Sequence, residues 1–256
     1  VNYERERLTL SDGDFVDLDW IDKQSRNLVL LAHGLEGNSD RHYMKGMAKH
    51  FADKNWDVLA WNCRSCSGEM NRQQRLYNHG EIGDIQEVIE HAIKTKKYEK
   101  IVLVGFSMGG NIILKYLGVH GTNIPSSIFK AIAFSAPCDL VSSVSLLDQP
   151  QSSFYKKRFL KKLKPKIEHK ANQFPGLIDF QNYSKINVWS DFDNYFTVPL
   201  NGFKNVTEFY AQGSALNFLE GIKIPALLVN AQNDPILTPQ CSPIQLCKTH
   251  PFLFLE

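Results

Sequence analysis

Short apolar runs alternate along the chain with segments whose apolar residues recur every three or four positions. The runs have the length of buried strands and lie at 28–32, 58–61, 101–104, 131–134, 226–229 and 252–255. Helical spacing is clearest at 43–51, 82–93 and 112–117. Strands that are apolar on both faces and alternate with helices are typical of a parallel sheet covered on each side. The pattern therefore predicts a doubly wound α/β fold with right-handed crossovers.

Two regions depart from this alternation. Near the start, 5–10 and 15–21 flank an Asp-Gly pair, which predicts an N-terminal hairpin. Between 139 and 222 no strand pattern is visible, and the segment is too long for an ordinary connection in a compact domain. We interpret 139–222 as a helical cap inserted into a core formed by 1–138 and 223–256.

Composition narrows the class of protein. The 256 residues include 29 Lys and Arg against 27 Asp and Glu, a net charge of +2, which argues against nucleic acid as a partner. No apolar run approaches the ~20 residues of a membrane-spanning helix. The charged N-terminus shows no signal peptide, and residues can precede it because an initiator Met is lacking. We expect a soluble, cytoplasmic protein.

The cysteines provide no disulfide framework, because their number, five, is odd. Cys63 and Cys66 form a C-x-x-C pair, which could be redox-active or half of a zinc site. No second pair and no suitably spaced histidines follow to complete about four zinc ligands. We interpret the pair as two thiols in a turn of a reduced protein, and we expect no metal or organic cofactor.

The clearest chemical motif is GFSMGG at 105–110, between the apolar run 101–104 and a helical pattern. A serine on a sharp strand-to-helix turn needs glycines two residues before and after it, because side chains there would collide with the neighbouring strand and helix. Such a turn presents the hydroxyl above the end of the strand. The context predicts that Ser107 is a catalytic nucleophile.

The segment HGLEG at 33–37 follows the strand 28–32, where such folds place part of an oxyanion hole. Two backbone N–H groups stabilise the negative oxygen of an acyl-transfer intermediate. We predict that these are the amides of Leu35 and Met108. His33 is then a structural residue that positions the loop rather than a general base.

A triad also needs an acid and a histidine. Asp234 follows the penultimate strand in the expected order after the serine, and Asp139 is the alternative acid. Among the eight histidines only His250 follows Asp234, but it precedes the strand 252–255. Active sites of such sheets lie at the carboxyl ends of the strands, so His250 is on the wrong side. We therefore expect the catalytic histidine beyond Glu256, outside this chain.

Together these motifs resemble the YheT-like branch of the α/β hydrolases, a group of proposed esterases related to eukaryotic membrane-associated lipases. The segments that carry the resemblance are 10–15, 33–37, 62–68, 105–111, 199–203, Tyr210 with Ser214, and 230–235. The resemblance implies an α/β-hydrolase fold, with Ser107 as nucleophile and Asp234 as acid. It also implies a histidine in a Gly-Gly-His-like segment after the last strand.

Two segments depart from the family pattern. The chain has Arg64-Ser65-Cys66 where the family has Arg-Gly-Cys, and Tyr77-Asn78-His79-Gly80 where the family has Tyr-His-Ser-Gly. We assign no role to the second of these loops. The predicted function is hydrolysis of a short- to medium-chain acyl ester or a lipid ester through an acyl-enzyme. The alternative is an inactive hydrolase fold that binds a ligand or a protein.

The predicted cap contains a basic segment, 154–170, with eight Lys or Arg and one Glu. Its apolar residues recur at helical spacing, and Pro165 is expected to limit that helix. We favour the interpretation of this segment as a solvated helix face whose apolar side covers the site. The alternative is a peripheral membrane contact, because a basic amphipathic segment can lie on anionic lipid.

Overall fold

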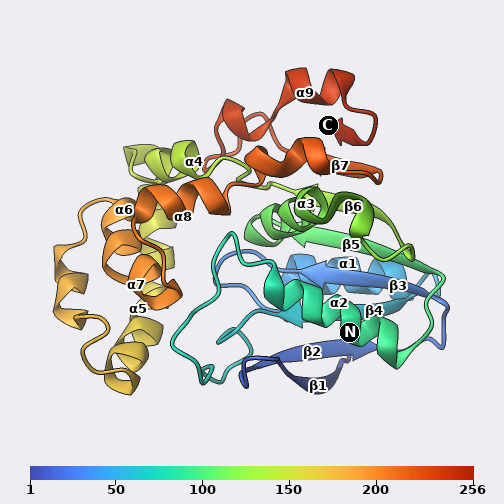
Figure 1. Cartoon of the computed structure of the whole chain (residues 1–256), viewed down its shortest axis with the longest axis horizontal. Helices are drawn as coiled ribbons and strands as arrows, with labels where there is room; N and C mark the ends of the chain where they lie inside the picture. Colours follow the sequence, from blue (N-terminus) through green and yellow to red (C-terminus); the bar gives the residue numbers. More distant parts are fainter.

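One eight-stranded sheet forms the centre of the computed structural model, which describes residues 1–256 (Figure 1). The strand order is β1-β2-β4-β3-β5-β6-β7-β8. The strands are β1 (Glu4–Thr9), β2 (Phe15–Ile21), β3 (Asn27–Ala32), β4 (Asp57–Asn62), β5 (Lys100–Phe106), β6 (Ile128–Phe134), β7 (Ala226–Val229) and β8 (Leu253–Leu255). β1 pairs antiparallel with β2 and β2 with β4, whereas every other pair is parallel. The predicted fold class and hairpin are confirmed.

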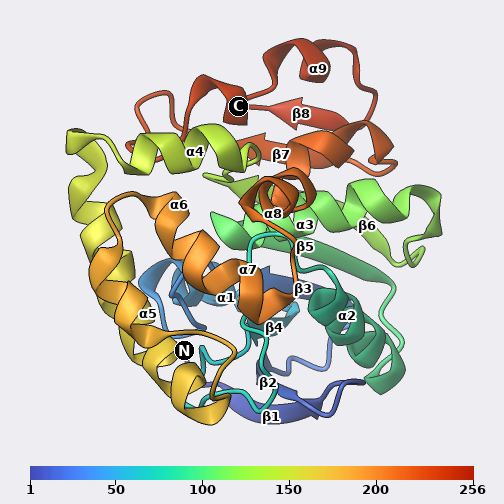
Figure 2. The same ribbon diagram turned by 60° about the vertical axis from the view of Figure 1, so that its left-hand side comes forward.

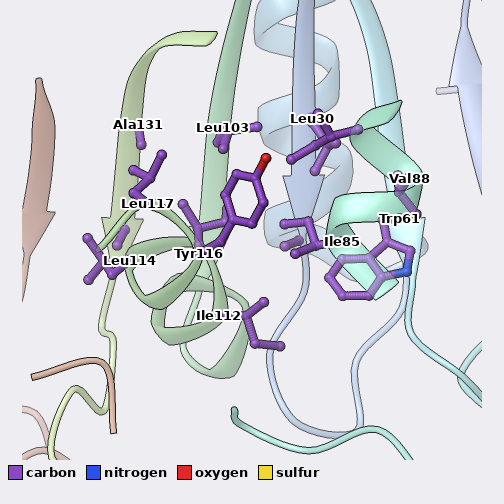
Figure 3. Packing of buried hydrophobic residues seen from close by; sticks show 14 of the residues in the cluster. Leu30, Trp61, Ile85, Val88, Leu103, Ile112, Leu114, Tyr116, Leu117 and Ala131 are labelled. Atoms are coloured by element: carbon purple, nitrogen blue, oxygen red, sulfur yellow. The ribbon is translucent and has the colours of Figure 1, made fainter. Parts of the chain in front are cut away.

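The central strands are apolar on both faces because each face packs against helices. In β3, Leu28 and Leu30 belong to the large apolar cluster that includes helices α2 (Gly83–Thr95) and α3 (Met108–His120). The alternate residues of the same strand contact α1 (His42–Ala52) on the other face. Figure 3 shows the first face, with Leu30 and Leu103 of the sheet opposite Ile85 of α2 and Tyr116 of α3. This double coverage explains the continuous apolar runs.

The segment between β6 and β7 contains helices and no strand. Its α-helices are α4 (Leu140–Leu147), α5 (Ser153–Gln173), α6 (Trp189–Phe192), α7 (Val198–Asn201) and α8 (Val206–Gly213). The same segment contains the 3₁₀ helices η2 (Pro150–Ser152), η3 (Phe180–Lys185) and η5 (Ala215–Gly221) and the π-helix η4 (Asp193–Thr197). Helices α4 to α8 gather at one end of the sheet (Figures 1 and 2). An aromatic cluster centred on Trp189, Phe192 and Phe196 joins α4 to α7, whereas Phe209 and Tyr210 of α8 pack with Leu140 and Val198 in a smaller cluster.

The last part of the expected cap packs with the core rather than with the aromatic cluster. Ala215, Leu219 and Ile222 are fully buried in the large cluster beneath the sheet. Gly118 of α3 contacts this segment so closely that a Cβ there would lie 2.1 Å from the carbonyl oxygen of Phe218. The covering helices therefore end near α8, and η5 returns the chain to the core.

The expectation that Pro165 limits the basic helix is wrong. α5 continues through Pro165 to Gln173. Proline removes one helical hydrogen bond, but Leu163 and Ile167 on either side of it are buried in the aromatic cluster. Packing of this face outweighs the local penalty.

The rest of the chain adds three short elements around the sheet. They are η1 (Gly121–Asn123), η6 (Pro239–Cys241) and α9 (Ile244–Thr249). None of the helices combines the length and the apolar content that crossing a bilayer would demand.

Candidate active site

Ser107 occupies the single residue between β5 and α3, where the chain reverses from strand to helix. Its backbone dihedrals are φ 53° and ψ −119°, a conformation that side-chain-bearing residues rarely adopt. The Ser107 N–H donates to the carbonyl of Phe134 in β6 at 2.8 Å, and the Ser107 carbonyl accepts from the Asn111 N–H at 3.0 Å. Strand and helix thus fix the strained turn from both sides.

Gly105 and Gly109, two residues before and after Ser107, are required because neighbouring backbone atoms leave no room for a Cβ. Their own backbone dihedrals are not the reason. A Cβ at Gly105 would lie 2.4 Å from the Gly109 carbonyl oxygen, and one at Gly109 would lie 2.4 Å from the Ala32 carbonyl oxygen. Only glycine permits this approach of helix and strand. The predicted geometry of the turn agrees with these contacts.

The loop 33–37 lies directly beside Ser107. A Cβ at Gly34 would be 3.1 Å from the Ser107 Cβ and 3.6 Å from its Oγ. His33 is fully buried: its Nδ1–H donates to the Gly34 carbonyl at 2.8 Å, and its Nε2 accepts from the Cys63 N–H at 3.1 Å. Burial lowers the pKa of His33 to about 4. With both ring nitrogens engaged, His33 supports the loop and is not free to accept a proton.

Two backbone N–H groups remain free beside the Ser107 hydroxyl. The Leu35 N–H donates to no atom of the protein, whereas its neighbours Gly34 and Glu36 donate to Tyr43 and Tyr77. Met108 is the first residue of α3, where a backbone N–H has no intrahelical acceptor. The helix dipole adds partial positive charge at the same point. These are the amides that the sequence predicts for an oxyanion hole.

Side chains from α5 hold the loop that carries Leu35. The Glu36 carboxylate accepts from Lys166 Nζ at 2.7 Å and from the Tyr77 hydroxyl. The Glu36 carbonyl accepts from Arg41 at 2.8 Å and from Lys162 at 3.2 Å. Because Lys162 and Lys166 belong to α5, the covering helices help to position the loop beside Ser107.

Ser107 lies where two spaces meet. On one side is an apolar cavity under the covering helices, which we call the apolar cavity; its lining includes Leu140, Leu147, Trp189, Phe209 and Tyr210. On the other side is an open cleft of about 420 Å³, which we call the open cleft. Leu35, Ser107, Phe159 and Ile236 line both. A bound molecule can therefore reach the hydroxyl from either side.

Asp234 follows β7, the strand beside the one whose Phe134 carbonyl binds Ser107. Its carboxylate accepts from the Ile236 N–H at 3.0 Å, and Ile236 lines both spaces around Ser107. Asp139 begins α4, and its side chain makes no hydrogen bond. The structure places Asp234 on the correct side of the sheet; its role as the acid stays a prediction.

His250 lies away from this cluster. Its Nδ1 accepts from the N–H groups of Phe252 at 3.1 Å and Leu253 at 3.0 Å, and its Nε2 lies 3.3 Å from the Glu220 carbonyl. Glu220 belongs to η5, which packs on the far end of α3 from Ser107. This position agrees with the prediction that His250 is not the catalytic base.

Comparisons with known proteins agree with this geometry. A family model described as alpha/beta hydrolase fold matches residues 27–251. YheT of Escherichia coli (strain K12), a proposed esterase, is 30% identical over 93% of this chain and 71% of its own length. The chain belongs to the α/β hydrolase family. The resemblance to its YheT-like branch is confirmed.

Other members of the family are more distant. Phospholipase ABHD3 of Mus musculus is 26% identical over 98% of this chain, which spans 63% of that relative. Among solved structures, the esterase Pf2001 of Pyrococcus furiosus superposes with a TM-score of 0.65 at 18% identity, covering 99% of this chain and 81% of Pf2001. At that identity the second comparison supports the fold alone.

Two polar residues in the covered cavity of this α/β hydrolase escaped the sequence analysis. Asp193 and His79 both line the apolar cavity and a second cavity that adjoins it. The Asp193 carboxylate accepts from Thr197 at 2.7 Å and from Tyr210 at 2.8 Å, and burial raises the pKa of Asp193 to about 7. Burial also lowers the pKa of His79 to about 4. Burial thus shifts both groups toward their neutral forms.

Asn111 fixes the His79 loop to α3, the helix that follows Ser107. Its fully buried amide donates to the carbonyls of His79 and Gly213, each at 2.7 Å, and its Oδ1 accepts from the Ala215 N–H at 3.0 Å. One side chain in the first turn of α3 thus binds three separate segments. The only sequence signal was a polar residue within an apolar helical pattern.

Cys63 and Cys66 are both buried as free thiols, and burial raises the pKa of each. No group of three or more His, Cys, Asp or Glu side chains could hold a metal ion. A buried thiol of raised pKa is unreactive. The geometry therefore favours the interpretation of this pair as structural thiols.

Proposed function

We propose that this chain is the catalytic portion of a serine hydrolase that cleaves carboxylic esters through an acyl-enzyme. The observation that carries the proposal is Ser107 on a strained turn, beside the free Leu35 N–H and at the mouth of an apolar cavity. A strained backbone that persists between a strand and a helix points to function. An acyl chain suits the apolar cavity.

In the proposed mechanism, Ser107 Oγ attacks the ester carbonyl and its proton passes to a histidine. The amides of Leu35 and Met108 donate to the oxyanion of the tetrahedral intermediate. The histidine then protonates the departing alcohol, and water attacks the acyl-enzyme with the same base. Asp234 orients that histidine, which we place beyond Glu256. No metal or organic cofactor takes part.

The relatives support the reaction class. YheT is a proposed esterase, and ABHD3 is a phospholipase. Because the chain spans 71% of YheT and 63% of ABHD3, the activity of the whole protein is part of the proposal. We propose that the substrate is a short- to medium-chain acyl ester or a lipid ester.

Labelling with a fluorophosphonate probe tests the proposal. We expect covalent labelling of Ser107 in the full-length protein and none in Ser107→Ala, whose ester hydrolysis should fall at least about 10³-fold. Ser145→Ala is the matched control, because Ser145 is exposed on α4 and should be neutral. If Ser107 is not labelled in the full-length protein, the alternative of an inactive fold that binds a ligand or a protein is favoured.

A further inference from the structure

The open cleft beside Ser107 is lined by three positively charged side chains from two separate parts of the chain. Arg41 precedes α1, whereas Arg158 and Lys162 lie one turn apart on α5. Arg158 is exposed to solvent, and the other two are partly buried. The cleft therefore gathers cations from the core and from the covering helices on the same side of the nucleophile.

None of these cations pairs with a carboxylate. Arg41 and Lys162 both donate to the Glu36 carbonyl, and Arg158 makes no hydrogen bond or ion pair. Glu36 is the one carboxylate that lines the cleft, and it is already bound by Lys166 at 2.7 Å. Burial and the nearby charges of Arg41 and Arg158 lower the pKa of Lys162. The cleft thus has a positive charge that the protein does not neutralise.

The two sides of Ser107 differ in what they can bind. The apolar cavity contains Leu140, Leu147 and Phe209 and no cationic side chain. Burial shifts its titratable groups, His79 and Asp193, toward their neutral forms. The open cleft offers cations and the two tyrosines Tyr43 and Tyr155. An ester bound at Ser107 would place its acyl chain in the first space and its alcohol portion in the second.

We propose that the open cleft is an anion subsite, in which Arg41, Arg158 and Lys162 bind a phosphate group carried by the alcohol portion of the ester. Arginine is suited to this ligand because its planar guanidinium donates two parallel hydrogen bonds to phosphate. The phosphate can belong to a lipid head group or to a soluble phosphate ester. That the ligand is a substrate rests on the proposed function, whereas binding of the phosphate does not.

Binding of a matched pair of ethers tests the subsite without requiring catalysis. The pair is 1-O-octylglycerol and 1-O-octylglycerol 3-phosphate, which differ only in the phosphate and contain no bond that the enzyme cleaves. We expect the phosphate compound to bind the full-length protein at least about tenfold more tightly by calorimetry, since charged hydrogen bonds are the strong ones. The preference should shrink as salt rises.

The decisive variant is Arg158→Gln, which is expected to weaken binding of the phosphate compound about tenfold and to leave binding of the neutral ether unchanged. Lys162→Gln is expected to weaken binding of the phosphate compound as much and of the neutral ether less, because Lys162 also donates to the Glu36 carbonyl in the loop beside Ser107. Lys157→Gln and Lys161→Gln are matched controls, because these exposed lysines adjoin the two on α5 but do not line the cleft. Equal binding of the two ethers, or equal loss in the control variants, overturns the subsite.

Glycerol 3-phosphate, which lacks the octyl chain, separates the sources of the anion. Weak binding of glycerol 3-phosphate supports a phosphate presented by a substrate that also fills the apolar cavity. Binding as tight as that of the octyl compound overturns the link to such a substrate. Fluorophosphonate labelling of Ser107 and binding of the two ethers are both measured on the full-length protein, which contains the histidine expected beyond Glu256. Failed labelling with intact phosphate preference would refute the esterase and leave the subsite standing.

Discussion

The core side and the cap side of the site are built in different ways. On the core side, close packing of the backbone positions the site. The glycines at 105 and 109 allow α3 to approach β3 and β5, and this packing fixes Ser107 and the amide of Met108. On the cap side, long side chains of α5 hold the loops of the core. Lys166 binds the Glu36 carboxylate, and Lys170 donates to the carbonyls of Asn71 and Gln73. The position of Ser107 thus depends on close packing, whereas the loops around it are held by charged side chains.

The largest expected effect is on the core side. Gly109→Ala places a Cβ 2.4 Å from the Ala32 carbonyl oxygen, and backbone there cannot yield as a side chain can. We expect a loss of about 3 kcal/mol or more in the free energy of unfolding, measured by urea denaturation.

Gly46→Ala is the matched control for that substitution. Gly46 lies in the middle of α1 with no atom within 4 Å of the position that a methyl group would take, so the same change should stabilise the protein by about 0.5–1 kcal/mol. Equal losses at both positions would contradict the argument from contact.

The next effect concerns the ion pair between Lys166 of α5 and Glu36 of the loop 33–37. Lys166→Met leaves the buried Glu36 carboxylate without its cation, at a site where Lys166 and Glu36 are 13% and 7% exposed. We expect a loss of about 2–4 kcal/mol, because an unpaired buried charge is left behind. Ester hydrolysis should fall as well, since the same loop carries the Leu35 amide.

The double variant Lys166→Met with Glu36→Gln separates these two effects. If the penalty comes from the unpaired carboxylate, the double variant recovers stability relative to Lys166→Met alone. Additive losses would show that the pair does not interact.

Asp193 gives an effect on stability that depends on pH. Burial raises its pKa to about 7 from the usual 3.8, so between those values the folded state binds more protons than the unfolded state. Stability from this group therefore falls as pH rises through that window, by about 1.4 kcal/mol for each unit of pKa shift.

Asp193→Asn should remove the decrease in stability that Asp193 causes as pH rises. We expect the variant to be as stable as the parent protein near pH 4 and more stable near pH 8, by thermal unfolding across the range. A parent protein whose stability rises between pH 4 and 7, with no change in the variant, would show that Asp193 is ionised in the folded state.

The smallest expected change in stability is at the outer surface of α5. Phe154 is 65% exposed, so Phe154→Ser should alter the free energy of unfolding by less than about 0.5 kcal/mol. If α5 contacts lipid, the same variant should sediment less with anionic vesicles. Unchanged sedimentation would favour the interpretation of this helix as a solvated face.

The elements that could be predicted from the sequence are those whose cause is local. An apolar run, a glycine pair and a helical pattern in direct succession specify the turn at Ser107, and the strand periodicity specifies the sheet. The prediction that Pro165 limits the helix was wrong because α5 is stabilised by Leu163 and Ile167, which pack against residues distant in the sequence. Local propensity could not reveal that packing.

The residues that were missed are those whose role arises from distant partners. Asp193 is one acidic residue in an aromatic segment until the fold brings Tyr210 to its carboxylate. His79 lies in a loop without periodicity, and Asn111 holds its backbone in the cavity wall. Arg41 and Arg158 become neighbours only when α5 covers the core. No spacing in the sequence expresses these pairings.

The Asn111 side chain has a consequence for how the molecule comes apart. It ties the start of the nucleophile helix to the loop at His79 and to the chain that leaves α8. A partial opening that frees one of these segments leaves the buried Asn111 side-chain amide without a hydrogen-bond partner. The backbone amide hydrogens of the three segments should therefore exchange with solvent as a single cooperative unit. Loss of the covering helices and loss of the turn at Ser107 are then one event.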